Sequence, residues 1–107
     1  MSHWARRPNP VFSDEYRALL EAVIETRRGA GLSQRDLAAR IGKHPSHVGM
    51  IERGQRRIDA LELYRMAKAF QVDPADLFDR IAKRVEAVQL AAARPASLVP
   101  SPVTEAR

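Results

Sequence analysis

The sequence predicts an all-α protein: one small domain built from five helices, with the last helix extended. Between residues 13 and 93, apolar residues recur at the i, i+3 and i+4 spacing of amphipathic helices. Each helical segment starts at a serine, aspartate or proline that favours helix starts, and the first three end at glycine. Residues 1–12 and 94–107 contain prolines and lack this periodicity. We therefore expect a flexible arm at 1–12, the domain at 13–80, a helical extension at 81–93 and a disordered tail at 94–107.

The first helix is expected to begin after Ser13, which is a favourable N-cap residue. Asp14 and Glu15 follow it and complement the positive N-terminal end of the helix dipole. Gly29 and Gly31 are expected to end the helix, because glycine is frequent just after helix ends. The expected inward face consists of Leu19, Leu20, Val23 and Ile24.

Residues 32–54, LSQRDLAARIGKHPSHVGMIERG, are predicted to form two short helices joined by a tight turn. Ser33 and Asp36 have the spacing of a capping box, which starts the first of these helices. Gly42 ends it, since glycine tolerates the backbone conformation of a tight turn. Pro45 suits the first position of the second helix. The expected inward face consists of Leu37, Ala38, Ile41, Val48 and Ile51.

Two further helices complete the expected domain. Asp59 and Glu62 have the spacing of a second capping box, and the helix that they start is expected to reach about Phe70. Asp73 followed by Pro74 is expected to start the last helix. The expected core residues here are Leu63, Met66, Ala67 and Phe70, followed by Leu77 and Phe78.

The last helix is expected to continue past the domain, because no helix breaker follows until Pro95. Ile81, Val85 and Val88 extend its apolar stripe at helical spacing. There are two alternatives for this extension: it packs back on its own domain, or it forms the seam of a dimer. We favour the dimer seam.

The segment 32–54 resembles the helix-turn-helix of the phage-repressor-type (Cro/Xre-like) family of DNA-binding proteins. The shared pattern is L-S-Q-x-x-L-A-x-x-I-G, a variable segment and V-x-x-I-E-x-G, and the resemblance extends over roughly residues 14–78. It implies a compact five-helix fold and a sequence-specific transcriptional regulator of double-stranded DNA. The expected regulator is a repressor that acts as a homodimer on an inverted repeat, with the helix at about 45–52 in the major groove. Activation through RNA polymerase, or control by a regulatory protein partner, is left open.

The distribution of charge agrees with a DNA-binding role. Eight Lys or Arg residues stand against two Asp or Glu residues between positions 27 and 57, so this stretch accounts for the whole net charge of +5. Such a concentration of positive charge is the electrostatic footprint of a protein that binds a polyanion. The sequence has no cysteine, which excludes disulfides and thiolate metal sites. It also shows no membrane-spanning run or signal peptide, so we expect a cytoplasmic, nucleoid-associated protein.

The arm at 1–12 has two interpretations. In the first interpretation, Arg6 and Arg7 reach a DNA groove or backbone, as the arms of some DNA-binding domains do. Alternatively, the arm is a frayed end with Trp4 or Phe12 packed against the domain. We favour the second interpretation, with Phe12 as a hydrophobic staple ahead of the Ser13 cap.

The outward positions of the helix at 45–52 are the expected base-facing residues. Val48 and Ile51 point inward, so the opposite positions face the major groove. The expected base-facing set is His44, Pro45, Ser46, His47, Gly49 and Met50.

Phosphate contacts are expected on both sides of that helix. The family resemblance implies that the amide of Gln34 and the helix N-terminus behind it hold a phosphate. The expected phosphate-contacting set is Gln34, Arg35, Lys43, Arg53, Gln55, Arg56 and Arg57. The resemblance also implies a structural ion pair between Arg27 and Glu52, which ties the first helix to the end of the third.

The base-facing set has few side chains that read base edges. Only Ser46 and the two histidines can hydrogen-bond a base, where many family members carry Gln, Ser, Lys or Arg. Three consequences are open. Met50 and Pro45 contact thymine methyl groups, with Gly49 allowing close approach; or the protein recognises its site indirectly, through the bendability of the DNA; or DNA binding is partly lost. Gly49 also costs the helix about 1 kcal/mol relative to Ala, so we expect some compensation for it.

Other chemistries have little support in the sequence. His44 and His47 form an H-x-x-H pattern, but a metal site needs three or four ligands and no further histidine lies nearby. No phosphate-binding glycine loop, catalytic triad or isolated carboxylate pair is present, so we expect no cofactor and no enzymatic activity. The alternative function is an antitoxin or adaptor-type protein-interaction module with weak DNA binding.

Overall fold

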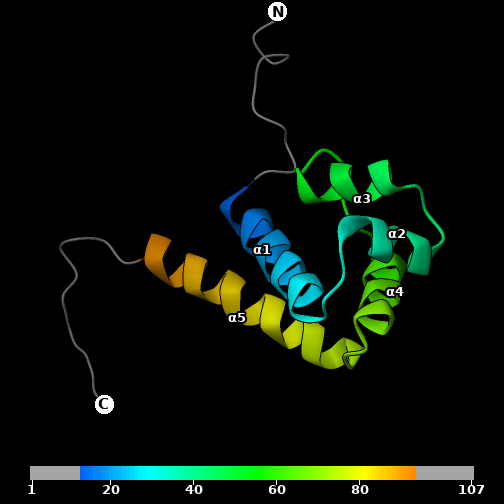
Figure 1. The fold of residues 1–107 in the computed structure, drawn as a ribbon. Helices are drawn as coiled ribbons and strands as arrows, with labels where there is room; N and C mark the ends of the chain where they lie inside the picture. Colours follow the sequence, from blue (N-terminus) through cyan, green and yellow to red (C-terminus); the bar gives the residue numbers. More distant parts are fainter. Residues whose placement is uncertain (1–12, 94–107) are drawn as a thin grey trace, which may run out of the picture.

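The computed structural model describes residues 13–93, which form five helices and no strand (Figure 1). The helices are α1 (Asp14–Gly29), α2 (Gln34–Ile41), α3 (Pro45–Glu52), α4 (Ala60–Phe70) and α5 (Pro74–Ala93). The all-α, five-helix prediction is therefore confirmed. The expectations for the arm and the tail, including those for Arg6, Arg7, Trp4 and Phe12, lie outside the described residues.

Local capping contacts start the helices at the expected places. Ser33 Oγ accepts the Asp36 amide at 3.0 Å, and Asp36 Oδ2 accepts the Ser33 amide at 2.9 Å, so the capping box of α2 is complete. The Ser33 backbone and hydroxyl hydrogen bonds lower the pKa of Asp36, because they stabilise its carboxylate form. Asp59 and Glu62 form the second box, at the start of α4. At Gly42, φ is 71°, the left-handed conformation that ends α2 and favours glycine.

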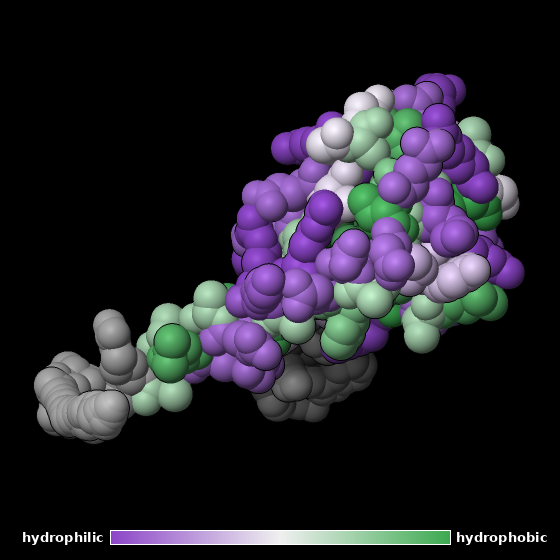
Figure 2. All heavy atoms as spheres, turned by 90° about the horizontal axis from the view of Figure 1, so that it is seen from below, coloured by the Kyte–Doolittle hydropathy of each residue, from purple (hydrophilic) through white to green (hydrophobic). Residues whose placement is uncertain are grey.

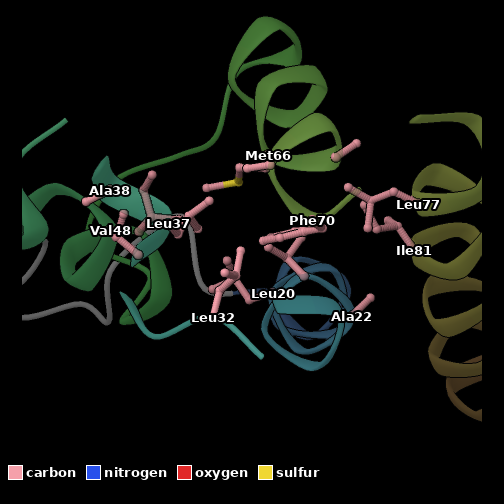
Figure 3. Packing of buried hydrophobic residues seen from close by; sticks show 14 of the residues in the cluster. Leu20, Ala22, Leu32, Leu37, Ala38, Val48, Met66, Phe70, Leu77 and Ile81 are labelled. Carbon is pink, nitrogen blue, oxygen red and sulfur yellow. The ribbon is translucent and has the colours of Figure 1, made fainter. Parts of the chain in front are cut away.

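The core collects side chains from all five helices. Leu37 of α2, Val48 of α3, Met66 of α4 and Leu77 of α5 are completely buried. Figure 3 shows Phe70 of α4 between the side chains of α2 and those of α5. Burying each such side chain contributes about 1.5–3 kcal/mol. This shared core fixes α3 relative to the other helices.

The extension at 81–93 is the second half of α5 and lies antiparallel to α1 (Figure 1). Arg80 Nη1 donates to Thr26 Oγ1 at 3.2 Å near the start of the contact, and Gln89 Nε2 donates to Glu15 Oε2 at 2.7 Å near its end. Ile81 is buried between the helices. The extension therefore packs on its own domain. Only the surface of the extension that faces away from α1 remains available for contact with a second copy.

The expectation that Phe78 closes the core is wrong, because its side chain is 60% exposed. Leu77, the residue before it, is completely buried. Successive helical residues point about 100° apart, so α5 turns only one of the two toward α1 and α4. Leu19 and Ile24 of the expected inward face of α1 are only half-buried, and Leu19 packs against the edge of the core.

Candidate nucleic-acid interface

α3 lies at the edge of the helix bundle, with one face in the core and the other on the surface (Figure 1). Val48 and Ile51 are completely buried, as the spacing predicts. Ser46 is exposed and Met50 is 39% exposed, while Pro45 is half-buried. This orientation leaves the outward face of α3 open to a macromolecular partner.

His44 lies at the surface just before α3 and caps that helix. Its Nδ1 accepts the backbone N–H of Ser46 at 3.1 Å and lies 2.8 Å from Ser46 Oγ. The sequence analysis did not assign His44 as the N-cap, because histidine is not among the favoured capping residues. One ring nitrogen of His44 is therefore already engaged by α3 itself.

The structure contradicts the assignment of His47 to the base-facing set. Its Nε2 donates to Glu62 Oε2 of α4 at 2.7 Å, and the two side chains are 15% and 9% exposed. His47 is next to Val48 on the helix, and the packing of α3 turns it toward α4. Glu62 has a role that the sequence analysis missed, since its capping-box spacing concerned only its other oxygen, which accepts the Asp59 amide. The pair holds α3 against α4.

One of the three open consequences, in which Gly49 lets DNA approach α3 closely, has to take account of the Arg53 side chain. Gly49 is buried, although it belongs to the outward side of α3. A Cβ atom at this position would lie 3.1 Å from Nη1 of Arg53 and 3.8 Å from Oε1 of Gln34. The Arg53 guanidinium therefore covers the glycine.

The expected pair of Arg27 and Glu52 is present, is buried and forms the centre of a hydrogen-bond network. Arg27 Nε donates to Glu52 Oε2 at 2.7 Å and Arg27 Nη2 to Glu52 Oε1 at 3.0 Å, and both side chains are 7% exposed. Arg27 Nη1 donates to the carbonyl of Leu32 at 2.8 Å. Gln34 Nε2 donates to Glu52 Oε1 at 2.8 Å. The network ties the end of α1, the start of α2 and the end of α3 together.

The cationic side chains divide into two groups. Arg27 and Arg40 serve the domain itself: the first is in the buried pair, and Arg40 Nη1 donates to the carbonyl of Ala69 in α4 at 3.1 Å. The charge count over residues 27–57 therefore overstates the positive charge available to a partner. The expected phosphate-contacting residues are all exposed: Gln34, Arg35, Lys43, Arg53, Gln55, Arg56 and Arg57.

Some of these exposed side chains are oriented by neighbours. The guanidinium of Arg57 lies 4.9 Å from the centre of the Tyr16 ring, a cation–π arrangement. Tyr16 in turn accepts the backbone N–H of Ile58 through its hydroxyl at 3.0 Å. The loop between α3 and α4 is thereby held on α1.

The part of the chain described by the structure contains no cluster of three His, Cys, Asp or Glu side chains that could hold a metal ion. No helix within residues 13–93 is long and apolar enough to cross a membrane.

A helix-turn-helix family model matches residues 23–77. The chain belongs to the XRE-like helix-turn-helix family. This XRE-family chain is 34% identical to a solved XRE-family-like protein from Pseudomonas syringae pv. tomato str. DC3000, over 65% of this chain and 85% of that one, with a TM-score of 0.61. Members of this family have the fold of regulators that bind double-stranded DNA. The family is one of DNA-binding regulators and not of enzymes.

Two other solved structures are similar. The clp gene regulator ClgR from Corynebacterium glutamicum is 26% identical, covering 81% of this chain and 92% of that one, with a TM-score of 0.62. A mutant of the restriction-modification controller protein C.Esp1396I is 22% identical, covering 69% and 99%, with a TM-score of 0.64, and shows the shared fold alone. No curated protein sequence matches the chain.

Proposed function

We propose that this XRE-family protein is a sequence-specific transcriptional repressor that binds an inverted repeat in double-stranded DNA as a homodimer. The observation that carries the proposal is the orientation of α3, whose apolar face is in the core while Ser46 and Met50 are on the surface. A helix presented in this way fits the major groove, with α2 across the DNA backbone.

Within this proposal the exposed residues have separate tasks. Ser46 donates or accepts a hydrogen bond at a base edge, and Met50 and Pro45 contact thymine methyl groups. His44 flanks them at the start of α3. The phosphate contacts fix the register of the protein on DNA and come from Gln34, Arg35, Lys43, Arg53, Gln55, Arg56 and Arg57.

The outer end of α5 supports the proposed homodimer. It projects from the body of the domain with a mainly apolar surface (Figure 2), and Leu90 is 69% exposed. Ala18 of α1 and Val88, Ala91 and Ala92 of α5 line a shallow groove beside it. A second copy that covered these side chains would give a dimer with two α3 helices, and we propose that each reads one half of the inverted repeat. Bound across a promoter in the cytoplasm, such a dimer blocks transcription.

The proposal is tested by selecting DNA from a random pool with the purified full-length protein and measuring affinity for the selected duplex by fluorescence anisotropy. We expect the selected sequences to share an inverted-repeat motif. We also expect the association constant K to fall steeply with salt concentration: a plot of log K against log salt should have a slope of about −0.9 for each phosphate that the protein neutralises. An antitoxin or adaptor-type module would instead give shallow, sequence-blind binding.

The dimer is tested separately by analytical ultracentrifugation of the wild type and of Leu90→Asp. We expect a dimer for the wild type and a monomer for the variant, because a carboxylate in an apolar seam is costly to desolvate. Phe78→Asp serves as the control, since Phe78 is also largely exposed, at 60%, but lies at the other end of α5. A monomeric wild type at concentrations that saturate DNA would exclude the dimer.

A further inference from the structure

The groove-facing surface of α3 is poor in hydrogen-bonding side chains that are free to read DNA. His47 is engaged by Glu62 at 2.7 Å. Ser46 and His44 bond to each other at 2.8 Å. Pro45 and Met50 have no strong donor or acceptor in their side chains. Because Ser46 is the main side chain of this surface that can hydrogen-bond a base, a sequence-specific protein with this α3 needs a further reading group.

Arg53 continues the row of residues on the outward face of α3. Pro45, Gly49 and Arg53 are four residues apart, so they lie on successive turns of the same face. Helical side chains lean toward the N-terminus of their helix, which brings the guanidinium of Arg53 back over Gly49. The structure agrees: a Cβ on Gly49 would lie 3.1 Å from Arg53 Nη1 and 3.8 Å from its Cζ.

A second contact fixes the plane of this guanidinium. Arg53 Nε and Nη2 donate to Gln55 Oε1 at 3.3 and 3.2 Å. Nη1 is not part of this contact and lies over Gly49. A guanidinium held by a neighbour loses less rotamer freedom when it binds, and its two-pronged edge matches the O6 and N7 acceptors of guanine.

We infer that Arg53, in place of the phosphate contact proposed above, is a specificity-determining residue that reads a guanine in the major groove, and that the missing side chain of Gly49 leaves the space in which its guanidinium lies. The inference rests on the proposed function of the chain as a sequence-specific DNA-binding regulator. It also supplies the compensation expected for a glycine inside a helix, because the missing side chain makes room for a reading group.

The glycine offers an unusual test of this role. Alanine is the better helix former, so Gly49→Ala favours the folded helix. The new Cβ would nevertheless stand 3.1 Å from Arg53 Nη1, which is tighter than ordinary packing, so the flexible guanidinium has to give way by a few tenths of an ångström. The substitution therefore disturbs the aligned position of the reading group without weakening the fold.

The experiment repeats the selection from a random pool with the full-length wild type, Gly49→Ala, Arg53→Lys and Arg56→Lys, with thermal unfolding as the measure of fold. Arg53→Lys keeps the positive charge and loses the two-pronged edge. Arg56→Lys is the matched control, since Arg56 is an exposed arginine of the same loop without a contact to α3 in the described hydrogen bonds.

We expect Gly49→Ala and Arg53→Lys to lose the same guanine from each half-site and to bind the wild-type motif about 5- to 150-fold more weakly, with little change in salt dependence. The variant with both changes is expected to be no worse than the worse single variant, because both act through one contact. Arg56→Lys changes a proposed phosphate contact, so any loss of affinity is expected to be the same for every sequence and the selected motif is expected to stay complete.

Two results would overturn the inference in different ways. If Arg53→Lys selects the complete wild-type motif, Arg53 is a phosphate contact and the reading role is wrong, while the proposed function stands. If the wild type itself selects no motif, the proposed function fails and the inference fails with it.

Discussion

The polar contacts that hold α2 and α3 in place are buried, whereas those that join α1 and α5 are exposed to solvent. At α3, the Arg27–Glu52 pair is 7% exposed on both sides and is bonded further into the domain. Along α1 and α5, Arg84 pairs with Glu21 and Glu25, whose side chains are 54% and 66% exposed. Breaking a buried pair leaves an unpaired buried charge, whereas exposed pairs contribute little.

The difference shows which part of the molecule has to be placed accurately. Buried polar contacts with side chains of α1 and α4 hold α3, the helix of the proposed DNA interface, in its position. The outer half of α5 depends on exposed ion pairs and on a narrow apolar stripe. Four substitutions test this contrast, and they run from the largest expected effect to the smallest.

Arg27→Ala should give the largest effect, because it leaves the Glu52 carboxylate buried without its ion-pair partner. We expect a loss of about 3–5 kcal/mol in the free energy of unfolding, measured by urea denaturation. DNA binding should fall in parallel, as a consequence of unfolding. The exposed neighbour Arg28 is the control, and Arg28→Ala should change the free energy by less than about 0.5 kcal/mol. Equal effects of the two substitutions would contradict the contrast.

His47→Ala should have the next largest effect, because Glu62 then loses a hydrogen bond in a site where its side chain is 9% exposed. We expect a loss of about 1–3 kcal/mol in the free energy of unfolding. The base preference of the remaining folded protein should be unchanged, since His47 faces α4. A changed preference would return His47 to the base-facing set and would argue against the orientation of this side chain.

Arg84→Ala should have a small effect, because its carboxylate partners are mostly exposed to solvent. We expect a loss of about 0.2–1 kcal/mol by urea denaturation, shrinking further as salt is added. A loss as large as that of Arg27→Ala would mean that α5 is positioned as rigidly as α3.

Asp36→Asn should have the smallest effect, and this effect should depend on pH. The pKa of Asp36 is lowered in the folded protein by the Ser33 hydrogen bonds. A depressed pKa means that the carboxylate stabilises the fold above its unfolded pKa, near pH 4, and that this contribution disappears as the pH falls through the lower, folded value. The difference in melting temperature between wild type and variant should therefore be present at pH 7 and shrink on acidification. A difference that grew toward low pH would contradict the assigned direction.

Much of the fold could be predicted from local sequence. The capping boxes of Ser33 with Asp36 and of Asp59 with Glu62 span three residues, so the chain positions both partners without help from the core. The burial of Val48 and Ile51 follows from helical periodicity in the same way. The family resemblance implied the Arg27–Glu52 pair, which local spacing alone does not predict because its members are 25 residues apart.

The sequence by itself thus determined the five helices, their ends and the apolar side of α3, since these depend on contacts within three or four residues. Tertiary structure alone decided how each helix is rotated about its axis against its neighbours. That rotation turned His47 toward Glu62, left Phe78 in solvent and directed Arg40 to the carbonyl of Ala69. It depends on how side chains from distant segments fill one shared core, and periodicity leaves the positions at the border between the two faces undecided.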